Sequence, residues 1–123
     1  MTKHRVLIVE DQADIRELIK MTLEFEDMDV AEADNGDVGW SATQASRPHL
    51  VLLDVMMPGS MDGFEVCRRI KADAKLKRTK VMMLTARGQT SDRAEGSRSG
   101  ADAYLTKPFS PKQLLEMVNW LLP

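Results

Sequence analysis

The sequence predicts an α/β fold in which a five-stranded parallel sheet carries helices on both faces. Five short apolar segments of strand length are spaced along the chain, and a segment of helical length follows each of them. The predicted strands are Val6–Val9, Val30–Ala33, Leu50–Leu53, Val81–Leu84 and Ala103–Leu105. This strict alternation predicts a doubly wound sheet, because parallel neighbours need a crossover helix between them.

The composition of the predicted strands indicates their positions in the sheet. The first, third and fourth are continuously apolar, which is typical of strands buried on both faces. The second strand carries Glu32, and the fifth is short and ends at Thr106-Lys107-Pro108, so these two are predicted to be edges. The order 2-1-3-4-5 satisfies this pattern, keeps every crossover short, and places the first and third strands side by side where the winding reverses.

The helical signals differ in strength along the chain. Ile15, Leu18 and Ile19 follow helical spacing in the first helical segment. Ser110–Gln113 is a helix start, with serine as the N-cap, proline at the first helical position and glutamine three residues after the cap. The segment Thr90–Ser99 is a weaker helix because it contains a glycine and several serines. We expect this fourth helix to be loosely held.

Composition and charge set the broad class of protein. The chain has 123 residues, of which 43% are hydrophobic and 29% charged, as expected of one soluble domain. The net charge of −2 gives no global drive toward nucleic acid or an anionic membrane. The single cysteine, Cys67, excludes an internal disulfide, and the first apolar run is too short for a signal peptide or a membrane span. A cytoplasmic location is therefore expected.

Three carboxylates are predicted to meet at one edge of the sheet. Val6–Val9 runs into Glu10 and Asp11, and Leu50–Leu53 runs into Asp54. The carboxyl edge of an open α/β sheet is where ligands bind. Two such charges about 4 Å apart repel by roughly 4 kcal/mol at an effective dielectric of about 20. The expected compensation is a hard divalent cation with oxygen ligands, most simply Mg²⁺, and such a site is typical of phosphate chemistry.

The chain resembles the receiver domains of bacterial two-component response regulators over essentially all of its 123 residues. The segments that carry the resemblance are Leu7–Asp11, Asp54–Pro58, Met61–Val66, Leu84–Ala86, Gly100–Tyr104 and Lys107–Phe109. Any one of them would be a weak signal, but together they occur in order and at the ends of the right strands. The resemblance implies a flavodoxin-like (βα)5 fold, with residues 1–123 as a single receiver domain and no output domain in this chain.

The resemblance also implies a metal-assisted phosphoacceptor. Asp54 matches the residue whose carboxylate attacks phosphorus and forms an aspartyl phosphate. Asp11, Asp54 and the backbone carbonyl of Met56 would bind Mg²⁺, or Mn²⁺ in its place, and Glu10 would reach the metal through water. The metal would offset the charge that develops during phosphoryl transfer.

A switch is implied by the residues around the acceptor. Lys107 would meet the phosphoryl oxygens with its charge, and Thr85 would donate a hydrogen bond to them. Thr85 would thereby move toward the phosphoryl group, and Tyr104 would turn into the vacated space. The face formed by the fourth helix, the fifth strand and the last helix would change shape. The resemblance further implies a cis peptide bond between Lys107 and Pro108.

The partners follow from the same resemblance. A histidine kinase or a phosphotransfer protein would supply the phosphoryl group, and an output protein or domain would read the changed face. No direct contact with nucleic acid or membrane is expected, and the chain is expected to be a monomer or a phosphorylation-dependent dimer. The basic stretch Arg68–Lys80 lacks interleaved aromatic residues, so it is interpreted as a solvated helix end and loop rather than a nucleic-acid patch.

The sequence departs from the family pattern in the loop after the acceptor. Gly59 and Ser60 both separate Pro58 from Met61, where relatives commonly have one residue. The loop is therefore predicted to be one residue longer, which bears on how a partner docks beside the site. The acid pair Glu10-Asp11 stands where many relatives have two aspartates.

Two other functions remain open at this stage. A haloacid-dehalogenase-like phosphohydrolase would also use an aspartate nucleophile and Mg²⁺, but such enzymes have a second aspartate where this chain has Met56, and they carry a cap domain. A receiver that acts without phosphorylation is the other alternative. The complete set of acids together with Thr85 and Lys107 argues against it.

Overall fold

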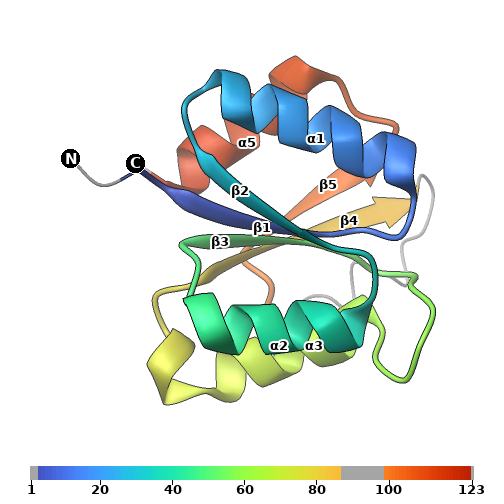
Figure 1. The fold of residues 1–123 in the computed structure, drawn as a ribbon, viewed down its shortest axis with the longest axis vertical. Coiled ribbons are helices and arrows are strands. Elements are labelled where there is room, and N and C mark those ends of the chain that lie inside the picture. The colour runs from blue at the N-terminus through green and yellow to red at the C-terminus, as the bar shows by residue number, and fades with distance from the viewer. Residues whose placement is uncertain (1–2, 87–98, 123) are drawn as a thin grey trace.

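The computed structural model describes residues 3–86 and 99–122. One parallel sheet holds five strands in the order β2-β1-β3-β4-β5 (Figure 1). The strands are β1 (Arg5–Val9), β2 (Asp29–Ala33), β3 (Leu50–Asp54), β4 (Lys80–Ala86) and β5 (Ala103–Lys107). The predicted strand order and the edge positions of β2 and β5 are therefore confirmed.

Helices cover both faces of the sheet. Those within the described residues are α1 (Ala13–Phe25), α2 (Gly36–Ser46), α3 (Gly63–Ala72), the short 3-10 helix η1 (Ala74–Leu76) and α5 (Pro111–Leu121). In Figure 1, α1 and α5 lie on one side of the sheet and α2 and α3 on the other. The fourth helix expected over Thr90–Ser99 falls on residues 87–98, outside the described part of the chain, apart from Ser99.

The central strands bury side chains on both faces because successive residues of a strand point in opposite directions. Leu7, Val51 and Met83 belong to the core beneath α2 and α3. Ile8 and Leu52 belong to the core beneath α1 and α5. Two cores therefore share one sheet, which is why the interior strands had to be apolar at every position.

The start of α5 and the apolar face of α1 can both be compared with the sequence. Ser110 Oγ accepts a hydrogen bond from the Gln113 N–H at 3.1 Å, and Gln113 Oε1 accepts one from the Ser110 N–H at 2.9 Å, so the predicted capping box is confirmed. In α1, Ile19 and Leu23 are buried, but Leu18 is 39% exposed. Leu18 shares the helical spacing, but the turn of about 100° per residue places it on the flank of the apolar stripe.

A partly buried ion pair fastens the start of β5 to two other elements. Lys71 Nζ on α3 donates to Asp102 Oδ2 at 2.6 Å and to the Thr79 carbonyl at 3.0 Å. The same Asp102 oxygen accepts a hydrogen bond from the Val81 N–H at 2.8 Å. Asp102 therefore fixes the amino end of the edge strand β5 against β4 and α3 just before the strand begins.

Candidate functional site

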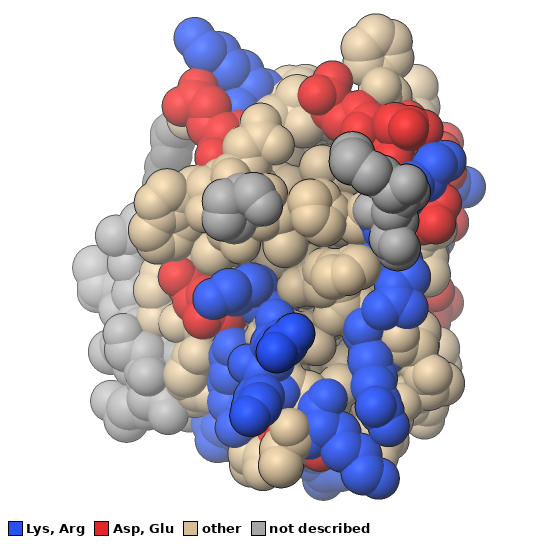
Figure 2. Space-filling view, turned by 90° about the vertical axis from the view of Figure 1, so that its left-hand side faces the viewer, with Lys and Arg blue, Asp and Glu red and all other residues tan. Residues whose placement is uncertain are grey.

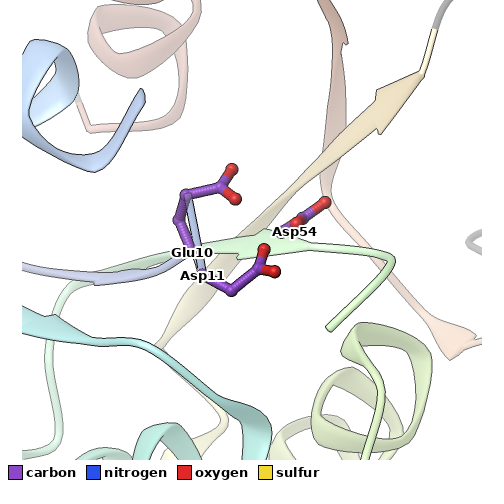
Figure 3. Close-up of side chains that lie close together, drawn as sticks. All are labelled: Glu10, Asp11 and Asp54. Atoms are coloured by element: carbon purple, nitrogen blue, oxygen red, sulfur yellow. The ribbon is translucent and has the colours of Figure 1, made fainter. Parts of the chain in front are cut away.

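The three predicted carboxylates meet at the carboxyl edge of the sheet. Glu10 and Asp11 follow β1, and Asp54 is the last residue of β3. The parallel register pairs Val9 with Leu53, so the acids that come next on the two strands face each other. One oxygen from each of Glu10, Asp11 and Asp54 lies within 4.8 Å of the others, and Figure 3 shows the three side chains turned toward a common space.

Burial differs sharply within this acid cluster of Glu10, Asp11 and Asp54. Glu10 has no solvent exposure and Asp54 is 5% exposed, whereas Asp11 is open to solvent. The strand reaches one residue further than the sequence predicted, because Asp54 itself is part of β3. The acceptor candidate therefore stands on buried, paired backbone with its carboxylate near the surface.

Lys107 is the cation closest to these acids among the contacts described. It is the last residue of β5, and its Nζ lies 2.8 Å from Glu10 Oε1 and 3.3 Å from Asp54 Oδ1. Since β4 separates β3 from β5 in the sheet, the long lysine side chain has to reach across a strand. The following peptide bond, between Lys107 and Pro108, is cis, the isomer that the resemblance implied.

The electrostatics of the metal-free site are strained. Burial, followed by the neighbouring Glu10 carboxylate, raises the pKa of Asp54 from 3.8 to about 7, although Lys107 acts in the opposite direction. Burial lowers the pKa of Lys107, but the hydrogen-bonding and ionic interactions with Glu10 and Asp54 outweigh it and leave that pKa above its usual value. Near neutral pH, part of the Asp54 population is therefore protonated in the metal-free protein.

The donor set fits a hard divalent cation. Glu10 Oε2 accepts a hydrogen bond from the Gln12 N–H at 3.2 Å. Its other oxygen, Oε1, lies 2.8 Å from Lys107 Nζ. One lysine charge faces three carboxylates, and a divalent cation would balance the remaining negative charge. Three carboxylates around one space are the ligand type that Mg²⁺ prefers.

The remaining candidate residues border the acid cluster. Met56 has a side chain that is 72% exposed, and its N–H donates to Asp54 Oδ1 at 3.4 Å. Thr85 on β4 is 1% exposed and follows Leu84, the register partner of Asp54. Tyr104 on β5 is partly buried and packs against the core beneath α2 and α3.

Thr85 and Tyr104 lie on the same face of the sheet. Tyr104 pairs with Met83 in the parallel register, and Met83 lies two residues before Thr85 on β4. Since alternate residues of a strand share a face, Met83 and Thr85 point the same way. The side chains of Thr85 and Tyr104 therefore project from the same face of neighbouring strands.

Two residues at the site were missed by the sequence reasoning. Arg16 on α1 donates from Nη1 to the Glu10 carbonyl at 2.8 Å and pairs with Glu32 on β2 at 3.1 Å, which fixes the chain where β1 ends. Gly63 begins α3 against β3, and a Cβ at this position would collide with the main-chain carbonyl of Asp54. Only the glycine of the Met61–Val66 motif gave a signal in the sequence.

The loop that contains Gly59 and Ser60 is hydrogen-bonded to α2. Ser60 Oγ donates to Asp37 Oδ1, on α2, at 2.8 Å. Gly59 has a φ of 103°, a conformation that side chains rarely adopt. The extra residue therefore forms a defined turn on the rim of the site.

Comparison with known proteins identifies the class that this fold and acid cluster define. Residues 6–119 match the response regulator receiver domain, and the chain belongs to that family. The transcriptional regulatory protein ResD of Bacillus subtilis (strain 168) is 43% identical over 118 residues, which are 96% of this chain and 48% of ResD. The chain thus spans about half the length of this curated relative.

Solved structures of response regulators have the same fold as this chain. A putative response regulator from Chloroflexus aurantiacus has a TM-score of 0.93 at 31% identity, covering 98% of each chain. The chemotaxis response regulator CheY4 of Vibrio cholerae has a TM-score of 0.91 at 32% identity, covering 98% of this chain and all (100%) of CheY4. The predicted receiver fold and the predicted role in two-component signalling are therefore confirmed. Along the described ranges, no helix is long and apolar enough to span a membrane.

Proposed function

We propose that this receiver domain accepts a phosphoryl group on Asp54 from a histidine kinase or a phosphotransfer protein and signals through the resulting change in shape. The observation that carries the proposal is the acid cluster with Lys107 set 3.3 Å from the Asp54 carboxylate. Asp54 is the acid placed to act as nucleophile, since it ends a buried strand with its carboxylate beside the other two acids and 3.3 Å from Lys107 Nζ.

The chemistry needs little of the protein beyond positioning and charge. An Asp54 carboxylate oxygen forms a bond to phosphorus, while the bond from phosphorus to the donor nitrogen breaks and its electron pair leaves with the nitrogen. Asp54 has to be ionised to attack. The Lys107 ammonium favours that form, and after transfer it compensates the charge of the phosphoryl oxygens.

The residues that would hold the metal are the ones the sequence indicated. Asp11 and Asp54 would bind Mg²⁺ or Mn²⁺ directly together with the Met56 carbonyl, and Glu10 would bind through water. When bound, the cation supplies positive charge to the transferring phosphoryl oxygens. The gathering of the three carboxylates around one space and the exposure of Asp11 support this assignment.

The signal would leave through β5 and α5. Thr85 would donate to the phosphoryl group, and Tyr104 would follow it inward. A groove of about 670 Å³ runs beside Tyr104 and is bordered by Gln113 and the largely exposed Trp120 on α5. An output protein or domain would read this face. We further propose that residues 1–123 act as one domain in the cytoplasm, as a monomer or as a phosphorylation-dependent dimer.

The direct test is intact mass after incubation with acetyl phosphate and Mg²⁺. One added phosphoryl group is expected on the wild type, and none without metal. Asp54→Asn should remain unlabelled, whereas Asp62→Asn should label like the wild type, because asparagine also caps α3 and leaves the acid cluster intact.

Other outcomes of this test would count against the proposal. Labelling of the Asp54→Asn variant would place the acceptor elsewhere. If neither an adduct nor released phosphate is found, a receiver that acts without phosphorylation would be favoured. Turnover of unrelated phosphoesters would favour a phosphohydrolase.

A further inference from the structure

A basic cavity lies at the amino edge of the sheet, at the opposite end of the strands from the acid cluster. The cavity has a volume of about 360 Å³. Its basic lining residues are Arg5, Arg47, His49, Lys75, Lys77 and Arg78. Figure 2 looks onto this edge and shows Lys and Arg side chains gathered on its lower half. Among the described residues that line the cavity, none is acidic.

The fold assembles these cations from separate segments. Arg5 begins β1, Arg47 follows α2, Lys75 lies in η1, and Lys77 and Arg78 precede β4. The amino ends of parallel strands meet at one edge, so residues far apart in the sequence share the cavity. The sequence alone showed only the stretch Arg68–Lys80 and could not show this gathering.

The structure divides that basic stretch into two groups. Arg68 and Arg69 pair with Glu65 on their own helix, at 3.2 and 2.9 Å. Lys71 forms a partly buried ion pair with Asp102. The cavity is instead lined by the later residues of the stretch, Lys75, Lys77 and Arg78.

Four of the cations in the cavity have no acidic counterpart. Arg47, Lys75, Lys77 and Arg78 are exposed. None of these four side chains forms a salt bridge within the part of the chain that the structure describes. Like charges held around a hollow repel each other and raise its positive potential. An anion bound in the hollow would relieve that repulsion.

The cavity walls are held in place without a ligand. Arg5 donates from Nη1 to the Ser46 carbonyl at 3.0 Å and from Nη2 to the Arg47 carbonyl at 2.8 Å. Its N–H donates to His49 Nδ1 at 2.8 Å, so a neutral His49 carries its proton on Nε2, where it can serve a ligand. Thr79 Oγ1 donates to the Pro48 carbonyl at 2.8 Å. A site fixed beforehand loses less entropy on binding.

We propose that the basic cavity binds a small anion with two or more phosphate groups. One phosphate monoester carries a charge of about −2, which would balance fewer than half of the five permanent cations. Guanidinium groups match phosphate oxygens in pairs of hydrogen bonds, and the exposed Arg47 and Arg78 supply such groups. The volume lies within the range of roughly 300–1,000 Å³ that is usual for small-molecule sites.

Three features distinguish this cavity from the acid cluster and from a surface that binds nucleic acid. A five-residue strand spans about 17 Å, so the cavity is distinct from the acid cluster at the other end of β1 and β3. No Phe, Tyr or Trp borders the cavity, whereas single-stranded nucleic acid is usually held by stacking on such rings. The cations also enclose a hollow instead of following a line.

The experiment is calorimetric titration of the whole chain with sodium triphosphate, in EDTA so that the acid cluster carries no metal. We expect binding of one triphosphate per chain and no binding of sulfate at matched ionic strength. In the same complex, the NMR signals of the His49 ring should shift. ATP that binds like triphosphate would show that the phosphate chain suffices, and tighter binding of ATP would indicate a nucleotide.

Charge reversal then tests the location. Lys77→Glu and Arg78→Glu should each weaken triphosphate binding by about tenfold, since a reversal removes a charge-assisted hydrogen bond and adds repulsion. Lys112→Glu, which makes the same change of charge at an exposed position of α5, should leave binding unchanged. All three variants should keep the thermal unfolding midpoint of the wild type and the phosphorylation of Asp54.

Three results would overturn the proposal. One is the absence of triphosphate binding to the wild type. Another is an equal loss of binding in Lys112→Glu, which would indicate a general effect of charge. The third is binding of random duplex DNA in place of triphosphate, which would assign this edge to a nucleic-acid backbone.

Discussion

Lys107 Nζ lies closer to Glu10 than to Asp54, with distances of 2.8 and 3.3 Å. The lysine is therefore engaged by the fully buried glutamate before any phosphoryl group is present. Phosphorylation of Asp54 would offer it a second, more highly charged partner. The strength of the ion pair between Lys107 and Glu10 therefore determines how readily Lys107 turns to a phosphoryl group on Asp54.

Lys107→Ala should destabilise the metal-free protein by about 2–3 kcal/mol, because it leaves the buried Glu10 without its cation. Urea denaturation in EDTA measures this free energy of unfolding. Adding Glu10→Gln to Lys107→Ala should recover more than about 1 kcal/mol of the loss. Strictly additive effects of the two substitutions would show that the pair contributes nothing.

The raised pKa of Asp54 predicts a pH-dependent stability. The folded protein holds this proton up to about 7, whereas the unfolded chain loses it near 3.8. The unfolded state therefore binds fewer protons between these values, and the metal-free protein should lose stability as the pH rises through that window. Urea denaturation at a series of pH values in EDTA checks this.

Asp54→Asn should remove this fall in stability and make the metal-free protein more stable at pH about 8, by on the order of 2 kcal/mol. Asp62→Asn is the matched control, because Asp62 caps α3 and is not part of the acid cluster. A wild-type stability that stays level across the window would contradict the raised pKa.

Magnesium affinity should follow the same titration. Metal ligands have to lose their protons, so affinity should rise by about tenfold per pH unit below the pKa of Asp54 and level off above it. Calorimetric titration with MgCl₂ from pH about 5.5 to 8 measures the profile. An affinity independent of pH throughout would mean that Asp54 is not a ligand that titrates near 7.

The switch can be followed at a single aromatic ring. Tyr104 is the one tyrosine in the sequence, so fluorotyrosine incorporation gives one ¹⁹F NMR signal. That signal should shift when Asp54 is phosphorylated. In Thr85→Val, which keeps the shape of a buried side chain but lacks the hydroxyl, labelling should persist while the shift is lost. A full shift in this variant would separate Tyr104 from Thr85.

Close packing beneath the acceptor gives a further prediction. Gly63→Ala should destabilise the protein by about 2–3 kcal/mol and lower the rate of phosphorylation, since its Cβ would press on the Asp54 carbonyl. Thermal unfolding and timed intact-mass measurements report the two effects. An alanine variant with wild-type stability would show that α3 moves away at little cost.

The sequence predicted the sheet well because its strands are buried on both faces and leave continuous apolar runs, as in Leu50–Leu53. The convergence of Glu10, Asp11 and Asp54 followed from strand order alone. Strand ends were less certain. Asp54 and Lys107 proved to be the last residues of strands rather than parts of the following loops. Polar residues at a strand end carry no apolar signal, so hydrophobic runs underestimate the strand.

Contacts between distant segments could not be predicted in this way. Arg16 reaches the carbonyl of Glu10 through its helix geometry, and nothing in its spacing distinguishes it from other surface arginines. The basic cavity joins Arg5 and Arg47 to residues near position 77, and only the assembled sheet edge brings these together. Arg69 and Lys77 likewise look equivalent in the sequence, as two cations of one basic stretch. In the structure, Arg69 forms an ion pair with Glu65.

The fastening at Asp102 has a mechanical consequence for the edge strand. Asp102 is bound by Lys71 and by the Val81 N–H, so the amino end of β5 is held from two sides. The other end carries Lys107, whose counter-ions would change if Asp54 received a phosphoryl group. Because Asp102 holds the amino end of β5, we expect a displacement at Lys107 to be smaller at Tyr104, which lies only two residues beyond Asp102.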